Sequence, residues 1–248
     1  IVRNVFIVVP PGNEEIFNVP GTGQIVADSF VSTEALKKMA AVAGTSHVLT
    51  YSKGFPLDMG RHAPERMMQV CLDTGAGMVY SDYFEKKNDV MAPHPVIDYQ
   101  EGSLRDDFNF GSVVLYDGNA FREACSRMDQ DYSYAGLYDL RLKISQNHPL
   151  IRIPEMLYTE VETDTRKTGE KQFDYVDPRN RAVQVEMERA CTHHLKCIGG
   201  WLAPHFTDVK FDEGDFENVA SVVIPVRNRV KTIGDAINSV LSQKTRYK

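Results

Sequence analysis

Cysteine is scarce in this sequence, and long apolar runs are absent. Four cysteines occur in 248 residues, and their spacing shows no pairs. The pattern therefore predicts reduced thiols rather than a disulfide framework. No stretch approaches the ~18 apolar residues of a membrane-spanning helix, and the opening IVRNVFIVVPPG lacks the apolar core and cleavage pattern of a signal peptide. These absences predict a cytoplasmic protein.

Positive charge is also in short supply. Lysine and arginine together number 28 against 34 acidic residues, which gives a formal net charge of −6. A protein that binds nucleic acid neutralises phosphates with a basic face, and no basic stripe is visible, so nucleic-acid partners are not expected. The length suits one large α/β domain, or a domain followed by a fragment of another.

One stretch that contains cysteine invites comparison with a zinc site. CTHHLKC, at 191–197, would place His193 and Cys197 four residues apart on one face of a helix. A closed zinc site needs four ligands, and no second pair lies nearby in the sequence. An ordinary helix surface is therefore preferred to a zinc site, and no bound metal is expected.

Short apolar strands alternate with amphipathic helices through the first two thirds of the chain. Breakers such as Pro10, Gly44 and Gly75 separate them. This alternation predicts an α/β fold with a mainly parallel sheet flanked by helices. The predicted strands are Val5–Val9, Ile25–Val26, His47–Tyr51 and Met78–Tyr80, and the predicted helices run from Ser32 or Thr33 to Ala43, over Pro64–Thr74 and over Arg179–Lys196.

The last part of the chain begins a second pattern of the same kind. An acidic stretch of low periodicity predicts a linker at 206–219 between a domain at 1–205 and a segment at 220–248. Ser221–Ile224 is predicted to be a strand that ends at Pro225. Thr232 is the expected cap of the helix that follows, whose apolar residues recur at helical spacing.

Residues 220–243, ASVVIPVRNRVKTIGDAINSVLSQ, resemble the first strand and helix of family 2 glycosyltransferases of the GT-A fold. In that family this turn contacts the nucleotide, so the resemblance implies nucleotide binding by Pro225, Asn228 and Arg229. Arg227 departs from the pattern, because the family usually has an aromatic residue there. By the strand and helix pattern alone, these residues would only end a strand.

Most of residues 1–150 resembles the rest of that family, but three functional positions differ. The metal-binding D-x-D triplet is replaced by Ser52-Lys53-Gly54, and an acidic pair is replaced by Pro10-Pro11. Leu137 stands at the position of the catalytic base, which leaves Asp139 as the remaining candidate catalytic residue. The resemblance therefore implies that the fold is kept and that metal-dependent sugar transfer is lost from this region.

Two polar loops supply further candidates for phosphate or acceptor binding. Arg105, Asp106 and Asp107 precede a predicted strand and lie in a loop, where binding residues are often found, although an Asx-type cap with a surface ion pair is the preferred explanation. Arg166 and Lys167 lie in a basic loop that could close over a diphosphate, although such charge runs are more often only solvated. Lys53 could contact phosphate as a point charge.

The expected function is that of a catalytically degenerate region of a glycosyltransferase, whose parent enzyme uses Mg²⁺ or Mn²⁺, a nucleotide-sugar donor and a glycan acceptor. The alternatives are a non-catalytic glycan-binding or scaffold module, and metal-independent transfer through Lys53 and the basic loop. Peripheral association with a membrane is a further expectation. Ser221–Ile224 is expected to pair beside Val5–Val9, within one chain or in a domain-swapped dimer.

Overall fold

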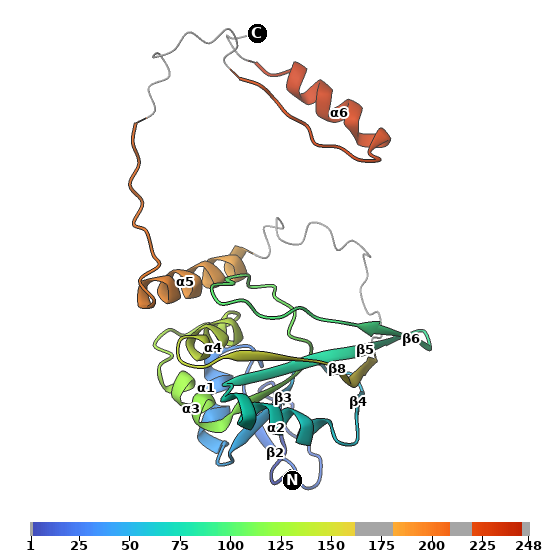
Figure 1. The fold of residues 1–248 in the computed structure, drawn as a ribbon, viewed down its shortest axis with the longest axis vertical. Helices are drawn as coiled ribbons and strands as arrows, with labels where there is room; N and C mark the ends of the chain where they lie inside the picture. Colours follow the sequence, from blue (N-terminus) through green and yellow to red (C-terminus); the bar gives the residue numbers. More distant parts are fainter. Residues whose placement is uncertain (1, 162–180, 209–219, 245–248) are drawn as a thin grey trace. The chain divides into compact units, whose positions relative to one another are not determined.

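Strands and helices alternate along the chain in the computed structural model, which describes residues 2–161, 181–208 and 220–244 (Figure 1). The chain divides into two compact units, Ile1–Trp201 and Leu202–Lys248, and each is described by itself. The elements of the first unit are β1 (Phe6–Val9), β2 (Gly23–Val26), α1 (Thr33–Val42), β3 (His47–Tyr51), β4 (Leu57–Met59), α2 (Ala63–Thr74), β5 (Met78–Lys87), β6 (Val90–His94), β7 (Val113–Asp117), α3 (Gly118–Ser126), α4 (Gly136–Ser145), β8 (Leu150–Val161) and α5 (Arg181–Cys197).

Local capping explains where several helices begin and end. The Ser32 hydroxyl accepts a hydrogen bond of 3.1 Å from the Ala35 N–H and starts α1, as its sequence position predicted. The Asp117 carboxylate accepts from the N–H groups of Asn119 and Ala120 at the start of α3, both at 2.9 Å. Gly75 ends α2 in the left-handed conformation, with φ of 66°.

The strands form two sheets of mixed direction. β1 and β2 pair in parallel in a two-stranded sheet, and a six-stranded sheet has the order β3-β7-β5-β8-β4, with β6 also pairing with β5. β5 and β8 are parallel, whereas β3–β7, β7–β5, β5–β6 and β4–β8 are antiparallel. The α/β class is confirmed, but the larger sheet is mixed rather than mainly parallel.

β8 is a long strand that the sequence pattern did not reveal. Its sequence LIRIPEMLYTEV contains Pro154, which cannot donate to a ladder. The register against β5 skips at this point, because Ile153 faces Ser81 whereas Met156 faces Asp82. The resulting bulge lets β8 continue along β5 as far as Val161.

Helices cover both faces of the larger sheet. The side chains of β7 alternate, so Val114 and Tyr116 pack with Phe121 of α3 in one core cluster. Val113 and Leu115 pack with α2 on the other face. This burial on both faces explains the continuous apolar sequence of β7.

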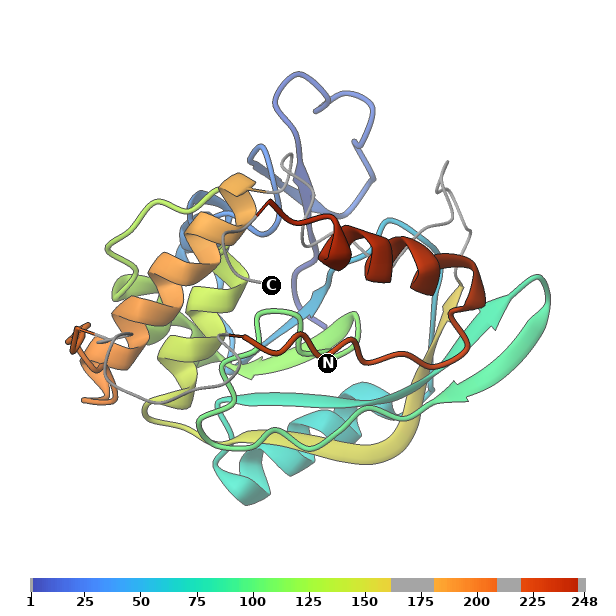
Figure 2. The same ribbon diagram turned by 90° about the horizontal axis from the view of Figure 1, so that it is seen from above.

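α5 lies along α4 on the outside of the unit (Figure 2). Leu142 of α4 and Ala190 of α5 are fully buried in a third cluster, with Tyr138 packed beside them. α5 therefore packs against α4 and, among the described residues, not against the sheet.

The second unit contains α6 (Val230–Leu241), which confirms the predicted helix but corrects its start. α6 begins two residues before Thr232, and no side chain caps it. Ser221–Ile224 is not a strand in the structure. Its expected pairing beside Val5–Val9, within one chain or in a domain-swapped dimer, stays a prediction.

A buried ion pair fixes β5 to β8 at the bulge. The Arg152 guanidinium donates to both oxygens of Asp82, at 2.8 and 2.7 Å, and the Val96 N–H donates to the same carboxylate at 3.0 Å. Burial raises the pKa of the Asp82 carboxyl, but the hydrogen bonds from Arg152 and Val96 outweigh it and hold this pKa below its usual value. At neutral pH Asp82 is therefore ionised, and both of its carboxylate oxygens accept hydrogen bonds from other groups of the protein.

Replacing Asp82 by Asn should lower the free energy of unfolding at pH 7 by about 2–4 kcal/mol, because Arg152 loses its buried partner. A depressed native pKa stabilises the fold above the unfolded pKa of about 3.9, and this stabilisation is lost as the pH falls through the native pKa. The difference between wild type and D82N in urea unfolding should therefore shrink below about pH 4. Asp98→Asn, at an exposed partner of the same arginine, is the control. An unchanged difference from pH 7 to pH 2.5 would contradict this account.

Candidate functional site

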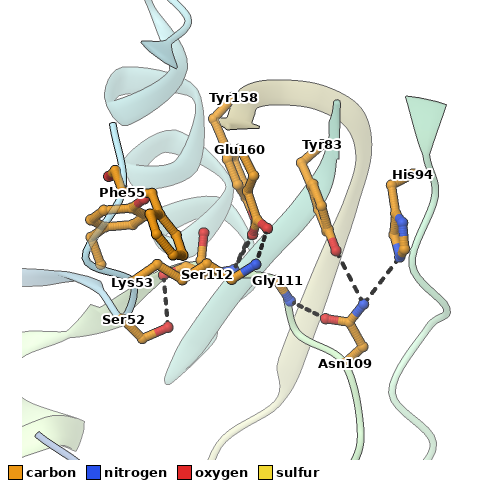
Figure 3. A network of polar contacts seen from close by, with 11 residues as sticks. Ser52, Lys53, Phe55, Tyr83, His94, Asn109, Gly111, Ser112, Tyr158 and Glu160 are labelled. Atoms are coloured by element: carbon orange, nitrogen blue, oxygen red, sulfur yellow. Dashed lines mark hydrogen bonds and ion pairs between the residues drawn. The ribbon is translucent and has the colours of Figure 1, made fainter. Parts of the chain in front are cut away.

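A polar network gathers at one end of the larger sheet (Figure 3). It combines residues that directly follow β3, residues that lead into β7, and the last part of β8. The Ser52 N–H donates to the Ser112 carbonyl at 3.0 Å, which continues the β3–β7 pairing beyond the strands. Three strands thus hold the side chains of this network in place.

Glu160 is the centre of the network. Its side chain is only 3% exposed, and it forms an ion pair with the Lys53 ammonium group. Its second oxygen accepts a hydrogen bond of 3.1 Å from the Ser112 N–H. A buried carboxylate is costly unless it is both paired and hydrogen-bonded, and Glu160 meets both conditions.

Aromatic rings form one side of the same network. Tyr83 stacks on Tyr158 with ring centroids 5.2 Å apart, and on His94 at 4.5 Å. The Asn109 amide donates to the Tyr83 hydroxyl at 3.4 Å and contacts His94 Nε2 at 3.2 Å. The stack carries hydrogen-bonding groups at its edge, and His94 and Asn109 are accessible to solvent.

The turn before β7 requires a glycine. Gly111 has φ of +74°, and a Cβ atom there would lie 2.0 Å from the Tyr158 hydroxyl oxygen. The Gly111 N–H donates to Asn109 Oδ1 at 2.8 Å. Because no side chain occupies this position, the Tyr158 hydroxyl can accept a hydrogen bond of 3.0 Å from the Ser112 N–H.

Besides its N–H group, Ser112 has a side-chain hydroxyl inside this network. The residue is 2% exposed, and its Oγ atom is buried with no hydrogen-bond partner among the described residues. A buried hydroxyl is normally paired. Ser112 Oγ is therefore an unsatisfied polar atom in the closed interior of this network, out of reach of a ligand in this conformation.

The electrostatics of the network are close to neutral. Burial, followed by the negative charge of Glu160, raises the pKa values of the Tyr158 and Tyr51 hydroxyls, so both stay protonated. Lys53 supplies one positive charge, and Glu160 balances it. The arrangement favours hydrogen bonding and ring stacking with a hydroxylated ligand over binding of a highly charged one.

The structure places the predicted residue Lys53 in this network, but with its charge already paired. The predicted Arg105 lies in a loop apart from the network, where its guanidinium pairs with Asp107 at 2.9 Å, and both side chains are about two thirds exposed at 68% and 69%. Asp106, beside them, is also exposed. The surface ion pair is therefore confirmed, and acceptor binding by these residues stays a prediction.

Asp139, the candidate catalytic residue, is buried in α4 rather than open to a substrate. It is 2% exposed, and its carboxylate lies 3.3 Å from the Lys143 ammonium, which is also buried. Burial raises the pKa of the Asp139 carboxyl, and Lys143 only partly offsets this effect. Leu137 packs against the core cluster under α1 and α3. Neither residue belongs to the network around Glu160.

The remaining predicted residues lie elsewhere. Pro225, Asn228 and Arg229 belong to the second unit and are exposed in the turn before α6. Asn228 has φ of 56°, and the Arg229 carbonyl accepts the first helical hydrogen bonds. Arg166 and Lys167 lie outside the described residues.

Residues 2–161, 181–208 and 220–244 contain no cluster of three or more His, Cys, Asp or Glu side chains placed to hold a metal ion. In the CTHHLKC stretch, the Cys197 sulfur lies 3.5 Å from His193 Nε2. Within the same described ranges, no helix is both long and apolar enough to cross a membrane.

Sequence reasoning missed Glu160, Tyr158 and His94. Glu160 and Tyr158 belong to β8, whose apolar pattern Pro154 interrupts, and β6 ends at His94 in a stretch rich in proline. The alternation of Tyr158 and Glu160 on one face of β8 was the signal that could have pointed to them.

Models of known protein families give no match to this chain, and curated protein sequences give none either.

Replacing Lys53 by Met should lower the free energy of unfolding by about 1–2 kcal/mol, because Glu160 loses the cation that balances its buried charge. The loss is moderate because solvent already screens the half-exposed lysine. Glu160→Gln should also destabilise the protein, since Ser112 then loses a charged acceptor. The double variant should be more stable than the sum of the two effects implies. Strict additivity in chemical denaturation would contradict a direct interaction between the two side chains.

Proposed function

We propose that this region is a catalytically degenerate GT-A domain of a glycosyltransferase, one that moves a sugar from a nucleotide donor to a glycan acceptor. The observation that carries the proposal is the Lys53–Glu160 pair at the end of β3. In the family that the sequence resembles, the metal-binding triplet aligns with Ser52-Lys53-Gly54. An ammonium group stands where the aligned triplet would supply carboxylates.

The groups at this position do not fit a divalent cation. Mg²⁺ and Mn²⁺ take several oxygen ligands, mostly carboxylates. Of the candidate carboxylates, Glu160 is bound to Lys53 and to the Ser112 N–H, and Asp82 is bound to Arg152 and the Val96 N–H. A cation would have to break one of these buried pairs, which supports the loss of metal-dependent transfer.

The same network supports a second candidate function, which is non-catalytic binding of the acceptor glycan. Sugars offer hydroxyl groups for hydrogen bonds and apolar faces for stacking on aromatic rings. Asn109 and His94 lie at the accessible edge of the Tyr83 stack. This set of groups suits a hydroxylated ligand.

Calorimetric titration with UDP-sugars, with and without Mn²⁺, tests the proposal. We expect no heat that depends on the metal and no turnover of the nucleotide sugar. A metal-stimulated transferase or hydrolysis rate that Asp139→Ala abolishes would overturn it. Binding without metal that Lys53→Met removes would favour metal-independent transfer instead.

A parallel titration with neutral oligosaccharides separates the second candidate from a scaffold. Binding that Asn109→Ala and His94→Ala each weaken at least fivefold is expected for a glycan site at the network. Urea unfolding of each variant shows whether the protein is intact. Binding that both variants leave unchanged would contradict a glycan site here.

A further inference from the structure

A groove runs along the outer face of α5, away from the Glu160 network. Its volume is about 500 Å³, and its lining includes Gln130 and Tyr132 together with Arg189, Thr192, His193 and Lys196. The four α5 residues recur at helical spacing, so they share one face. The neighbouring face of α5, with Met187, Ala190 and Cys191, packs in the cluster that α5 shares with α4.

A carboxylate of α5 binds the segment that forms the opposite wall of the groove. Glu186 accepts hydrogen bonds from the N–H groups of Ser133, Tyr134 and Ala135, at 3.1, 2.7 and 3.1 Å. These N–H groups lie in the turn just before α4, close to its amino-terminal end, where a negative charge is favoured. The contacts fix the segment that carries Gln130 and Tyr132, so the groove is a built feature of the fold.

The cations along the groove are positioned without being neutralised. Arg189 donates to the Gln130 side-chain oxygen at 3.0 Å and lies over the Tyr132 ring at 5.8 Å. Lys196 lies over the Trp201 ring at 4.6 Å. Neither cation forms an ion pair with a carboxylate within the described ranges, and Glu188 is the one acidic residue in the lining. Neutral partners orient both charges and leave them available to an anion.

Trp201 places an aromatic surface beside these charges. It follows the end of α5, where its N–H and that of Gly200 donate to the Leu195 carbonyl at 3.1 and 2.9 Å. Its side chain is 40% exposed. A cation beside a partly exposed indole ring can engage an acidic group and the apolar face of a sugar ring together.

We propose that this groove binds an acidic oligosaccharide, one that carries carboxylate or sulfate groups. The inference rests on the proposed function, because that function makes the expected ligand a glycan acceptor. The new elements are the negative charge of this acceptor and a second surface that binds it. A nucleic acid, whose regular phosphates need a broad basic face, does not suit a groove whose described lining residues offer only Arg189 and Lys196 as cations. Two cations in one groove suit the spaced charges of an acidic glycan.

Trp201 is the single tryptophan of the chain, so its fluorescence reports on the groove. The full chain is titrated with a galacturonic acid hexamer, a sulfated hexasaccharide and a neutral maltohexaose. Both acidic ligands should change the emission and bind, with an affinity that falls at least fivefold between 50 and 300 mM salt. Maltohexaose should leave the emission unchanged, so a neutral glycan bound at the Glu160 network stays distinguishable.

Two variants and a matched control locate the site. Arg189→Gln and Lys196→Gln should each weaken binding of the galacturonic acid hexamer about tenfold, measured by calorimetry because Lys196→Gln alters the Trp201 environment. Arg61→Gln removes the same charge from an exposed position outside the groove and should have no effect. Absence of acidic-ligand binding, equal weakening by Arg61→Gln, or equally tight binding of an acidic peptide would each overturn the proposal. Sugar-nucleotide binding is measured separately, so its failure is not confused with failure here.

Discussion

The burial of the Glu160 carboxylate is the constraint on which the polar end of the sheet depends. A carboxylate that is 3% exposed must find a cation and a hydrogen-bond donor, and these come from Lys53 after β3 and from the Ser112 N–H at the start of β7. The Ser112 N–H also donates to the Tyr158 hydroxyl. Residue 111 must therefore be glycine, because a side chain there would collide with this hydroxyl. One buried charge therefore fixes the ends of three strands.

The same principle recurs at the other buried acids of the first unit. Asp82 is held by Arg152 between β5 and β8, and Asp139 lies against Lys143 within α4. In each case a basic side chain of the chain itself faces the carboxylate and partly or fully balances its charge. These buried acids serve the architecture of the first unit.

The sequence predicted the local elements better than their assembly. β3 has the predicted bounds, and Ser32 caps α1 as expected, because periodicity and capping are encoded within a few residues. β8 was missed because Pro154 interrupts its apolar pattern. The predicted strand at Ser221–Ile224 was wrong, because a short apolar run does not by itself specify a pairing partner. For the site, Lys53 could be found by its unusual place in an aligned motif. Glu160 could not, because the contact joins residues 107 positions apart.

The most direct measurement of the central claim is a crystal of the chain soaked with Mn²⁺ and a UDP-sugar, examined by anomalous scattering. The account predicts an intact Lys53–Glu160 pair and no manganese peak at the end of β3. A manganese ion held there by oxygen ligands, with Glu160 released from Lys53 and coordinating it, would contradict the account.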